Sequence, residues 1–113
     1  MNAYLRKAFS ALCELEGLPE PVYEYQIEAL LPRRWRYDIC FPDQKVIVEV
    51  EGGAWTRGRH TRGKGFLSDI EKYNAAVVLG YRLLRYAPDS VLTDKAMEEI
   101  KNLLSLTGGD DYG

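Results

Sequence analysis

Three carboxylates lie close together in a stretch that otherwise has the composition of buried sheet. The stretch runs RWRYDICFPDQKVIVEVEGG from 34 to 53, with Asp38 in its first half and Glu49 and Glu51 in its second. A carboxylate without a partner is costly among apolar strands. A divalent cation would supply the partner, because Mg2+ and Mn2+ take carboxylate oxygens and leave other positions to water and phosphate. The alternative is a half-exposed sheet whose acids pair with cations of the same stretch.

A hairpin is the element that would bring these acids together. Residues 35–41 and 45–51 alternate in character on either side of Pro42-Asp43-Gln44, as two antiparallel strands and a tight turn do. With Asp43 and Gln44 as the loop, Asp38 lies directly opposite Glu49. The period of two then predicts two faces. One face carries Arg36, Asp38, Cys40, Ile47, Glu49 and Glu51, and the other carries Trp35, Tyr37, Ile39, Phe41, Val46, Val48 and Val50.

The residues around the hairpin predict three helices and two further strands. Apolar spacing and the stop and start residues place a helix over 2–16, an outer strand over 22–30, a helix over 66–79, a strand over 81–86 and a last helix from Thr93 or Asp94. A helix that ends at Gly80 and leads into a strand is typical of a parallel crossover. We therefore expect an α/β fold in which helices flank a mixed four-stranded sheet, in the order αβββαβ plus a C-terminal helix. The chain would form a single domain over 1–106 with a flexible tail over 107–113.

Two charged side chains of the flanking helices are placed to approach the hairpin. Glu16 falls inside the apolar stripe of the first helix and is a further candidate cation ligand; its alternative is an acid of the last turn that reaches solvent. On the next helix Asp69, Lys72 and Ala76 share a stripe whose edge can turn toward the strand ends with Glu49 and Glu51. The alternative for Lys72 is a surface ion pair. A second, apolar stripe of that helix consists of Phe66, Ile70, Tyr73 and Val77.

The connection over 52–65 has no hydrophobic periodicity. Besides five glycines it contains an aromatic residue and cationic or titratable side chains, namely Trp55, Arg57, Arg59, His60, Arg62 and Lys64. A stretch this long without structure of its own is usually functional or disordered in a small domain. Arginine for phosphate, glycine for close backbone approach and tryptophan for stacking are what a nucleic-acid-binding loop uses. The alternative is a flexible solvated loop.

Charge is unevenly distributed along the 113 residues, whose formal net charge is −2. Residues 33–64 hold eight Lys or Arg against four Asp or Glu, and a basic middle around three acids suits a polyanion held beside a cation. With 46% hydrophobic and 28% charged residues and no apolar run of membrane-spanning length, the chain is expected in the cytoplasm, away from membranes. Cys13 and Cys40 lack the spacing of a zinc or redox site and are expected to be buried free thiols.

The order of elements and the three acids resemble the PD-(D/E)XK nucleases, the restriction-endonuclease-like superfamily. In that family an Asp and, further on, Glu-x-Lys bind the catalytic metal, and here Asp38, Glu49 and Glu51 stand in those places. The stretch EVEGGAWTRGRHTRGKGFLSDIEKYNAAVVLGYRLLRY is similar to small phage and bacterial nucleases akin to the very-short-patch repair endonucleases, and the matching segments cover about 22–87. Tyr37 stands where the family has Pro. Glu51 stands where it usually has Lys, although some restriction enzymes of this fold carry Glu there too.

The resemblance implies a Mg2+- or Mn2+-dependent DNA endonuclease, acting in a bacterial or phage-infected cell. It implies that Asp38, Glu49 and the carbonyl of Val50 hold the metal, and that Glu51 binds a second cation or acts as a general base. Lys72 would replace the lysine absent at position 51 and, like Arg59, offset charge on the phosphorane, while His60 would transfer a proton. The expected DNA contacts are Arg34, Arg36, Trp55, Arg57, Arg59, Arg62 and Lys64.

Two functions of other classes stay open on the sequence. One is a catalytically inactive, nuclease-like nucleic-acid-binding module, against which the acids facing phosphate argue. The other is a different carboxylate–metal enzyme such as a phosphatase, against which the long basic connection argues because it favours a polymeric substrate. Mismatched, branched and site-specific DNA stay open as substrates, since fold does not fix substrate. A monomer and a homodimer both stay open as the active form.

Overall fold

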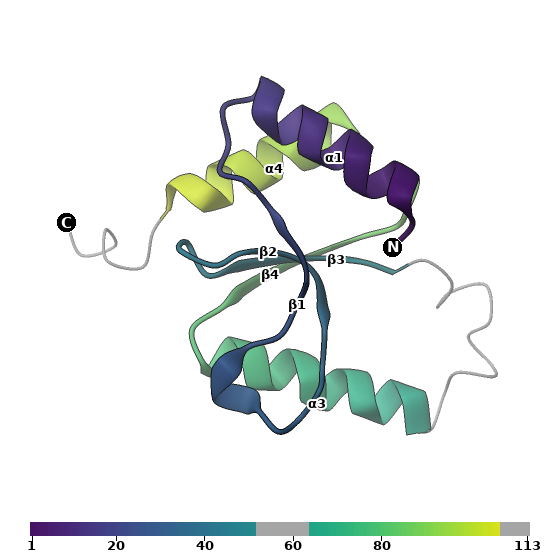
Figure 1. The fold of residues 1–113 in the computed structure, drawn as a ribbon, viewed down its shortest axis with the longest axis vertical. Helices are drawn as coiled ribbons and strands as arrows, with labels where there is room; N and C mark the ends of the chain where they lie inside the picture. Colours follow the sequence, from purple (N-terminus) through teal and green to yellow (C-terminus); the bar gives the residue numbers. More distant parts are fainter. Residues whose placement is uncertain (52–63, 107–113) are drawn as a thin grey trace.

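The computed structural model describes residues 1–51 and 64–106 and is drawn in Figure 1. Its elements are α1 (Ala3–Leu15), β1 (Val22–Tyr25), the short 3-10 helix η1 (Glu28–Leu30), β2 (Tyr37–Phe41), β3 (Val46–Val50), α3 (Lys64–Val78), β4 (Arg82–Tyr86) and α4 (Asp94–Ser105). The predicted order of helices and strands is confirmed. Within the described ranges, no helix has the length and apolar character needed to cross a membrane.

The four strands form one mixed sheet in the order β1-β2-β3-β4. The first three are antiparallel to their neighbours, while β4 lies parallel beside β3, as the predicted crossover through α3 requires. In the hairpin Ile39 pairs with Val48 and Phe41 with Val46, which is the predicted register. The turn closes with the Lys45 N–H donating to the Pro42 carbonyl at 3.1 Å. The sequence pattern therefore predicted both the α/β class and the pairing of the central strands.

Helices cover both faces of this sheet (Figure 1). The α1 and α4 layer packs on a core made of Phe9, Cys13, Ile39, Phe41, Val46, Val48, Val91, Met97, Ile100 and Leu104. The α3 layer, with η1 beside it, packs on a smaller core made of Ile27, Tyr37, Cys40, Ile47, Ala76 and Tyr81. Both cysteines are buried and free, as expected. The sheet is thus enclosed on two sides, and its strand ends are the places where polar side chains can gather.

Local signals explain where the helices of the first layer begin. Asn2 caps α1 by accepting a hydrogen bond from the Leu5 N–H at 2.8 Å, and Thr93 caps α4 by accepting one from the Ala96 N–H at 3.2 Å. Both helices are amphipathic, and the predicted packing side of α4 is confirmed. The buried residues of that side are Ala96, Met97, Ile100 and Leu104, with Leu103 partly buried.

The outer strand is shorter than the predicted 22–30. It ends at Tyr25, after which Ile27 turns inward and η1 begins. Glu24, within this strand, has a left-handed backbone with φ of +53°, and the residues paired on either side of it are Tyr23 with Ile39 and Tyr25 with Tyr37. The ladder is therefore interrupted opposite Asp38.

This interruption explains why one predicted face is wrong. Tyr37 was expected beside Ile39 and Phe41, but it packs in the α3 core with Cys40, and Trp35 follows it there. Past the irregular pair the strand has rotated, so the period of two no longer holds across Asp38. The remaining alternation of the hairpin, Val46, Val48 and Val50 included, is confirmed.

The stripe of α3 that meets the sheet is the one with Lys72 and Ala76. Ala76 is fully buried, whereas Ile70 and Val77 of the apolar stripe are exposed. Ala76 belongs to the core between the helix and the sheet, and Lys72 of the same stripe reaches Glu49. The side of the helix that faces the hairpin thus carries Lys72 and Tyr73 beside Ala76, and Tyr73 is partly buried against this core.

Candidate functional site

Asp38 and Glu49 bind each other's strand through main-chain hydrogen bonds. The Asp38 N–H donates to Glu49 Oε2 at 2.9 Å, and the Val50 N–H donates to Asp38 Oδ2 at 2.8 Å. These two bonds stand where the regular ladder between β2 and β3 has ended, beyond the pair of Ile39 with Val48. The predicted apposition of Asp38 and Glu49 is therefore confirmed, and each carboxylate also fixes the other strand.

Glu49 is the buried charged residue of this site. Its side chain is 5% exposed. Burial raises the pKa of Glu49, and the adjacent Asp38 carboxylate raises it further. Lys72 and the hydrogen bonds from the Asp38 N–H and the Tyr73 hydroxyl act in the opposite direction without cancelling the rise. A carboxyl group that is buried beside a like charge is one whose ionised form a cation would stabilise.

Lys72 supplies a positive charge from α3. Its Nζ lies 3.6 Å from Glu49 Oε1, and its side chain is 16% exposed. The ammonium also lies over the rings of Tyr37, at 5.0 Å, and Tyr73, at 5.7 Å, within cation–π range. The Tyr37 hydroxyl donates to the Lys72 carbonyl at 2.8 Å, which ties the helix to β2. The prediction that Lys72 turns toward the strand ends is confirmed.

Tyr73 joins this group to Glu51 and Arg85. Its hydroxyl donates to Glu49 Oε1 at 3.1 Å, and the Arg85 guanidinium lies 4.7 Å from the centre of its ring. Arg85 in turn binds both carboxylate oxygens of Glu51, through Nε and through Nη2. Burial and the nearby Glu49 raise the pKa of Tyr37 to about 12 and also raise that of Tyr73, so both hydroxyls stay protonated donors at neutral pH.

The donor set fits Mg2+ with two carboxylates. Asp38 Oδ2 accepts a hydrogen bond from the Val50 N–H, whereas Oδ1 accepts none from any residue of the described ranges. Mg2+ in phosphate-handling sites is held by one or two carboxylates together with waters and substrate phosphates. Across residues 1–51 and 64–106, however, no group of three or more His, Cys, Asp or Glu side chains is arranged to hold a metal. Glu51, paired with Arg85, is not a third ligand in this arrangement.

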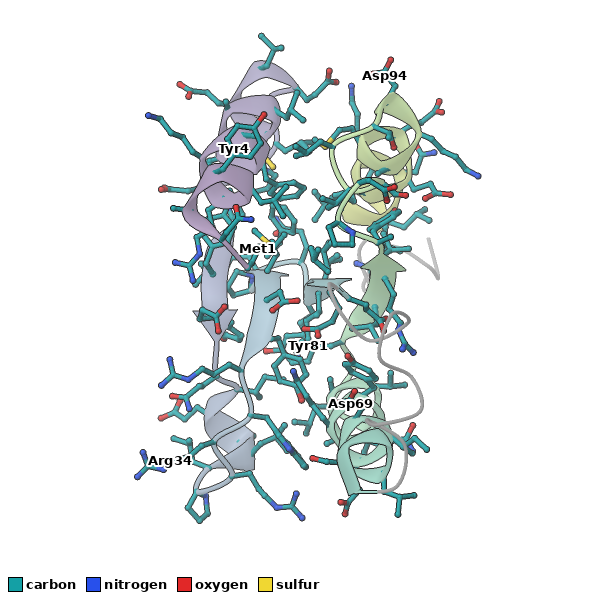
Figure 2. All side chains as sticks on the ribbon, turned by 90° about the vertical axis from the view of Figure 1, so that its right-hand side faces the viewer. Met1, Tyr4, Arg34, Asp69, Tyr81 and Asp94 are labelled. Carbon is teal, nitrogen blue, oxygen red and sulfur yellow. The ribbon has the colours of Figure 1, made fainter. Side chains whose placement is uncertain are left out.

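Three further predicted site residues, Glu16, Arg34 and Arg36, are exposed. Glu16 ends α1 and pairs with Lys101 of α4, with its Oε1 3.5 Å from the lysine Nζ, so its prediction as a cation ligand is wrong. The Glu16 side chain is 41% exposed, which agrees with the alternative of a last-turn acid that reaches solvent. Arg34 and Arg36 are exposed in the connection before β2. Figure 2 shows Arg34 on the outer side of the molecule, away from Asp69 of α3.

The predicted residues of the basic connection lie outside the described part of the chain. They are Trp55, Arg57, Arg59, His60 and Arg62, and the side chain of Lys64, where α3 begins, belongs with them. Their predicted contacts with DNA and the predicted proton transfer by His60 stay predictions.

Sequence reasoning missed Arg85 and the role of Tyr73. The parallel register of β3 and β4 pairs Glu49 with Arg85, two residues that are far apart in the sequence, and the side-chain pattern of either strand does not reveal this register. Tyr73 was assigned to the apolar stripe although it directly follows Lys72. A usable signal for Arg85 was its place near the end of a strand expected beside the acid-bearing one.

Comparisons with protein-family models, with curated proteins and with solved structures gave no match. What the site can do is therefore inferred from its own side chains. These are two apposed carboxylates, an enclosed ammonium, a tyrosine hydroxyl and an outer arginine–glutamate pair.

Proposed function

We propose that the chain is a Mg2+-dependent DNA endonuclease with a restriction-endonuclease-like core. The observation that carries the proposal is the apposition of Asp38 and Glu49 at the end of the hairpin, where a buried carboxylate with a raised pKa meets a second acid. Two acids brought this close are costly unless a cation joins them. A phosphodiester is the substrate class whose oxygens would complete such a cation's coordination.

Asp38 and Glu49 would hold the cation, together with the main-chain carbonyl of Val50. When bound, Mg2+ neutralises a nonbridging oxygen and lowers the pKa of a coordinated water. The hydrogen bonds from the Val50 and Asp38 N–H groups orient the two carboxylates before any ligand arrives, so little ordering remains to be done on binding.

Lys72 would replace the lysine that the PD-(D/E)XK pattern usually has at the place of Glu51. Its Nζ lies 3.6 Å from Glu49, and the rings of Tyr37 and Tyr73 limit its access to water. An ammonium held here offsets negative charge that develops on the phosphate during displacement. His60 is proposed for proton transfer on its chemistry alone, since it lies outside the described residues.

The basic composition of 33–64 supports a polymeric anion as the substrate.

One observation favours the alternative, an inactive nucleic-acid-binding module. Glu49 already has a cation in Lys72, and Glu51 has one in Arg85, so these acids are paired without a metal. The two readings differ in a single measurable property, which is cleavage.

The test uses purified protein with duplex, single-stranded, mismatched, branched and junction DNA in Mg2+ or Mn2+. We expect cleavage of at least one substrate by the parent, and its loss in Asp38→Asn and in Glu49→Gln, because each amide removes a ligand charge without opening a cavity. The matched control is Glu71→Gln, an acid-to-amide change on α3 whose acid is exposed and pairs with Arg33.

Thermal unfolding with and without Mg2+ gives a second measurement. A cation at about 100 times its Kd stabilises the parent by about 2.7 kcal/mol, and Asp38→Asn should lose this gain while Glu71→Gln keeps it. A parent that cleaves no member of the panel, or an Asp38→Asn variant that cleaves normally, would contradict the proposed function.

A further inference from the structure

Arg85 is the outward-facing cation of the candidate site. On β4 it is the parallel partner of Glu49 on β3, so it stands at the same end of the sheet as the two carboxylates. Its side chain is 51% exposed, against 16% for Lys72. A ligand arriving from solvent therefore meets Arg85 before it meets Lys72.

Two contacts hold the Arg85 guanidinium in place. Glu51 accepts hydrogen bonds from Nε and Nη2, and the ring of Tyr73 lies under the group at 4.7 Å. The bidentate bond raises the pKa of Arg85 still further. A guanidinium has five N–H donors in a fixed plane, and the pair with Glu51 uses two of them. The remaining donors are pre-oriented, which lowers the entropy lost when they bind a second anion.

We propose that Arg85 binds a backbone phosphate of the nucleic acid and that Glu51 is a positioning residue for Arg85, not a cation ligand. This inference rests on the proposed function and deepens it by assigning the substrate contact. The planar fork of arginine matches two phosphate oxygens as it matches the carboxylate of Glu51. Arg85, on the neighbouring strand, then adds a second positive charge to the one that Lys72 supplies from α3.

The rival interpretation is an ion pair that only neutralises Glu51. The chain offers a matched example in Arg6, which pairs with Glu24 at 3.4 Å and lies 5.4 Å from the centre of the Tyr23 ring. Arg6 belongs to α1, in the layer on the far side of the sheet from α3 (Figure 1). Arg6→Gln therefore removes a similar arginine without touching the site.

The experiment measures DNA affinity in EDTA by fluorescence anisotropy over about 50 to 200 mM salt. The double variant Arg85→Gln with Glu51→Gln is compared with the single variant Glu51→Gln, so that removing Arg85 leaves no unpaired acid to repel DNA. We expect affinity to fall about tenfold or more and the log–log salt slope to shrink by about 0.9, the value for one duplex phosphate contact. Arg85→Lys in the same background should keep the slope, and Arg6→Gln should change neither quantity.

Unchanged affinity and slope in Arg85→Gln would overturn the phosphate contact while leaving the proposed nuclease intact if the parent cleaves. A parent that binds no DNA would overturn both. The role of Glu51 has its own measurement: Glu51→Gln should leave the Mg2+ concentration for half-maximal cleavage unchanged, because the cation ligands are elsewhere. A tenfold increase in that concentration would make Glu51 a cation ligand and overturn its assignment as a positioning residue.

Discussion

Replacing Lys72 by Met tests whether the site contains a true buried charge pair. Methionine keeps the apolar stem over Tyr37 and Tyr73 and removes the ammonium that lies 3.6 Å from Glu49. Both side chains are largely enclosed, so the carboxylate left behind cannot recover its hydration. Breaking a buried pair by removing one partner costs about 3–5 kcal/mol. Because small domains are stable by about 5–15 kcal/mol, we expect Lys72→Met to stay folded with much reduced resistance to urea.

The direction of the pH dependence follows from Glu49. Its folded-state pKa already lies above the ordinary value of 4.5, and losing Lys72 removes one of the influences that lower it. A raised carboxyl pKa means that the native state binds more protons than the unfolded state between the two pKa values. Stability therefore falls as pH rises through this window and is regained as pH falls toward the ordinary value. The deficit of Lys72→Met should shrink as the pH is lowered from about 8 to about 5.

The assay is urea unfolding followed by circular dichroism at these two pH values. The control is Lys101→Met, which removes the lysine 3.5 Å from Glu16 in a pair whose side chains are 56% and 41% exposed. That change should cost about 0–1 kcal/mol. The double variant Lys72→Met with Glu49→Gln should recover much of the loss, because no uncompensated charge remains. If Lys72→Met costs no more than Lys101→Met at either pH, the reasoning about a buried pair is wrong.

Two further outcomes are expected. If Lys72 stabilises the transition state, Lys72→Met should lower turnover at saturating DNA by about 10²-fold or more, the cost of losing one such donor, and a variant that cuts as fast as the parent would leave Lys72 with a structural role. Burial raises the pKa of Cys13 and of Cys40 to about 12. At about pH 8 both thiols should therefore be inert to a thiol-specific reagent in the native protein and react in urea. Rapid reaction of either thiol in the native protein would contradict the packing of the core that contains it.

The central hairpin was predictable because its register depends on local information. Pro42-Asp43-Gln44 fixes the turn, and the alternation beyond it then sets Asp38 opposite Glu49, as found. The start of α4 was equally local, since Thr93 caps it. Short-range chemistry thus sufficed for the half of the site that lies on two consecutive strands.

The other half depends on contacts between distant segments. The left-handed residue Glu24 interrupts the ladder opposite Asp38, and no local pattern of β2 reveals that Tyr37 turns to the α3 side. Arg85 comes beside Glu49 through the parallel register of β3 and β4, which joins strands that are not consecutive along a hairpin. The prediction for Glu16 failed because helical periodicity assigns a face but does not say what that face meets, which here is Lys101 of α4.

Asp38 is bonded to β3 twice, through the Val50 N–H and through the Glu49 side chain, so the geometry of the site depends on the hairpin turn. A shift of one residue in strand pairing moves side chains to the opposite face, so an inserted or deleted residue between Pro42 and Lys45 would send one of the two acids toward the α1 and α4 core. Substitutions in the turn that keep its length leave the pairing as it is. Homologues of this chain should consequently vary in the exposed turn residue Asp43 and yet conserve the number of residues in the turn. Selection would then act on the length of a turn that is remote from the chemistry.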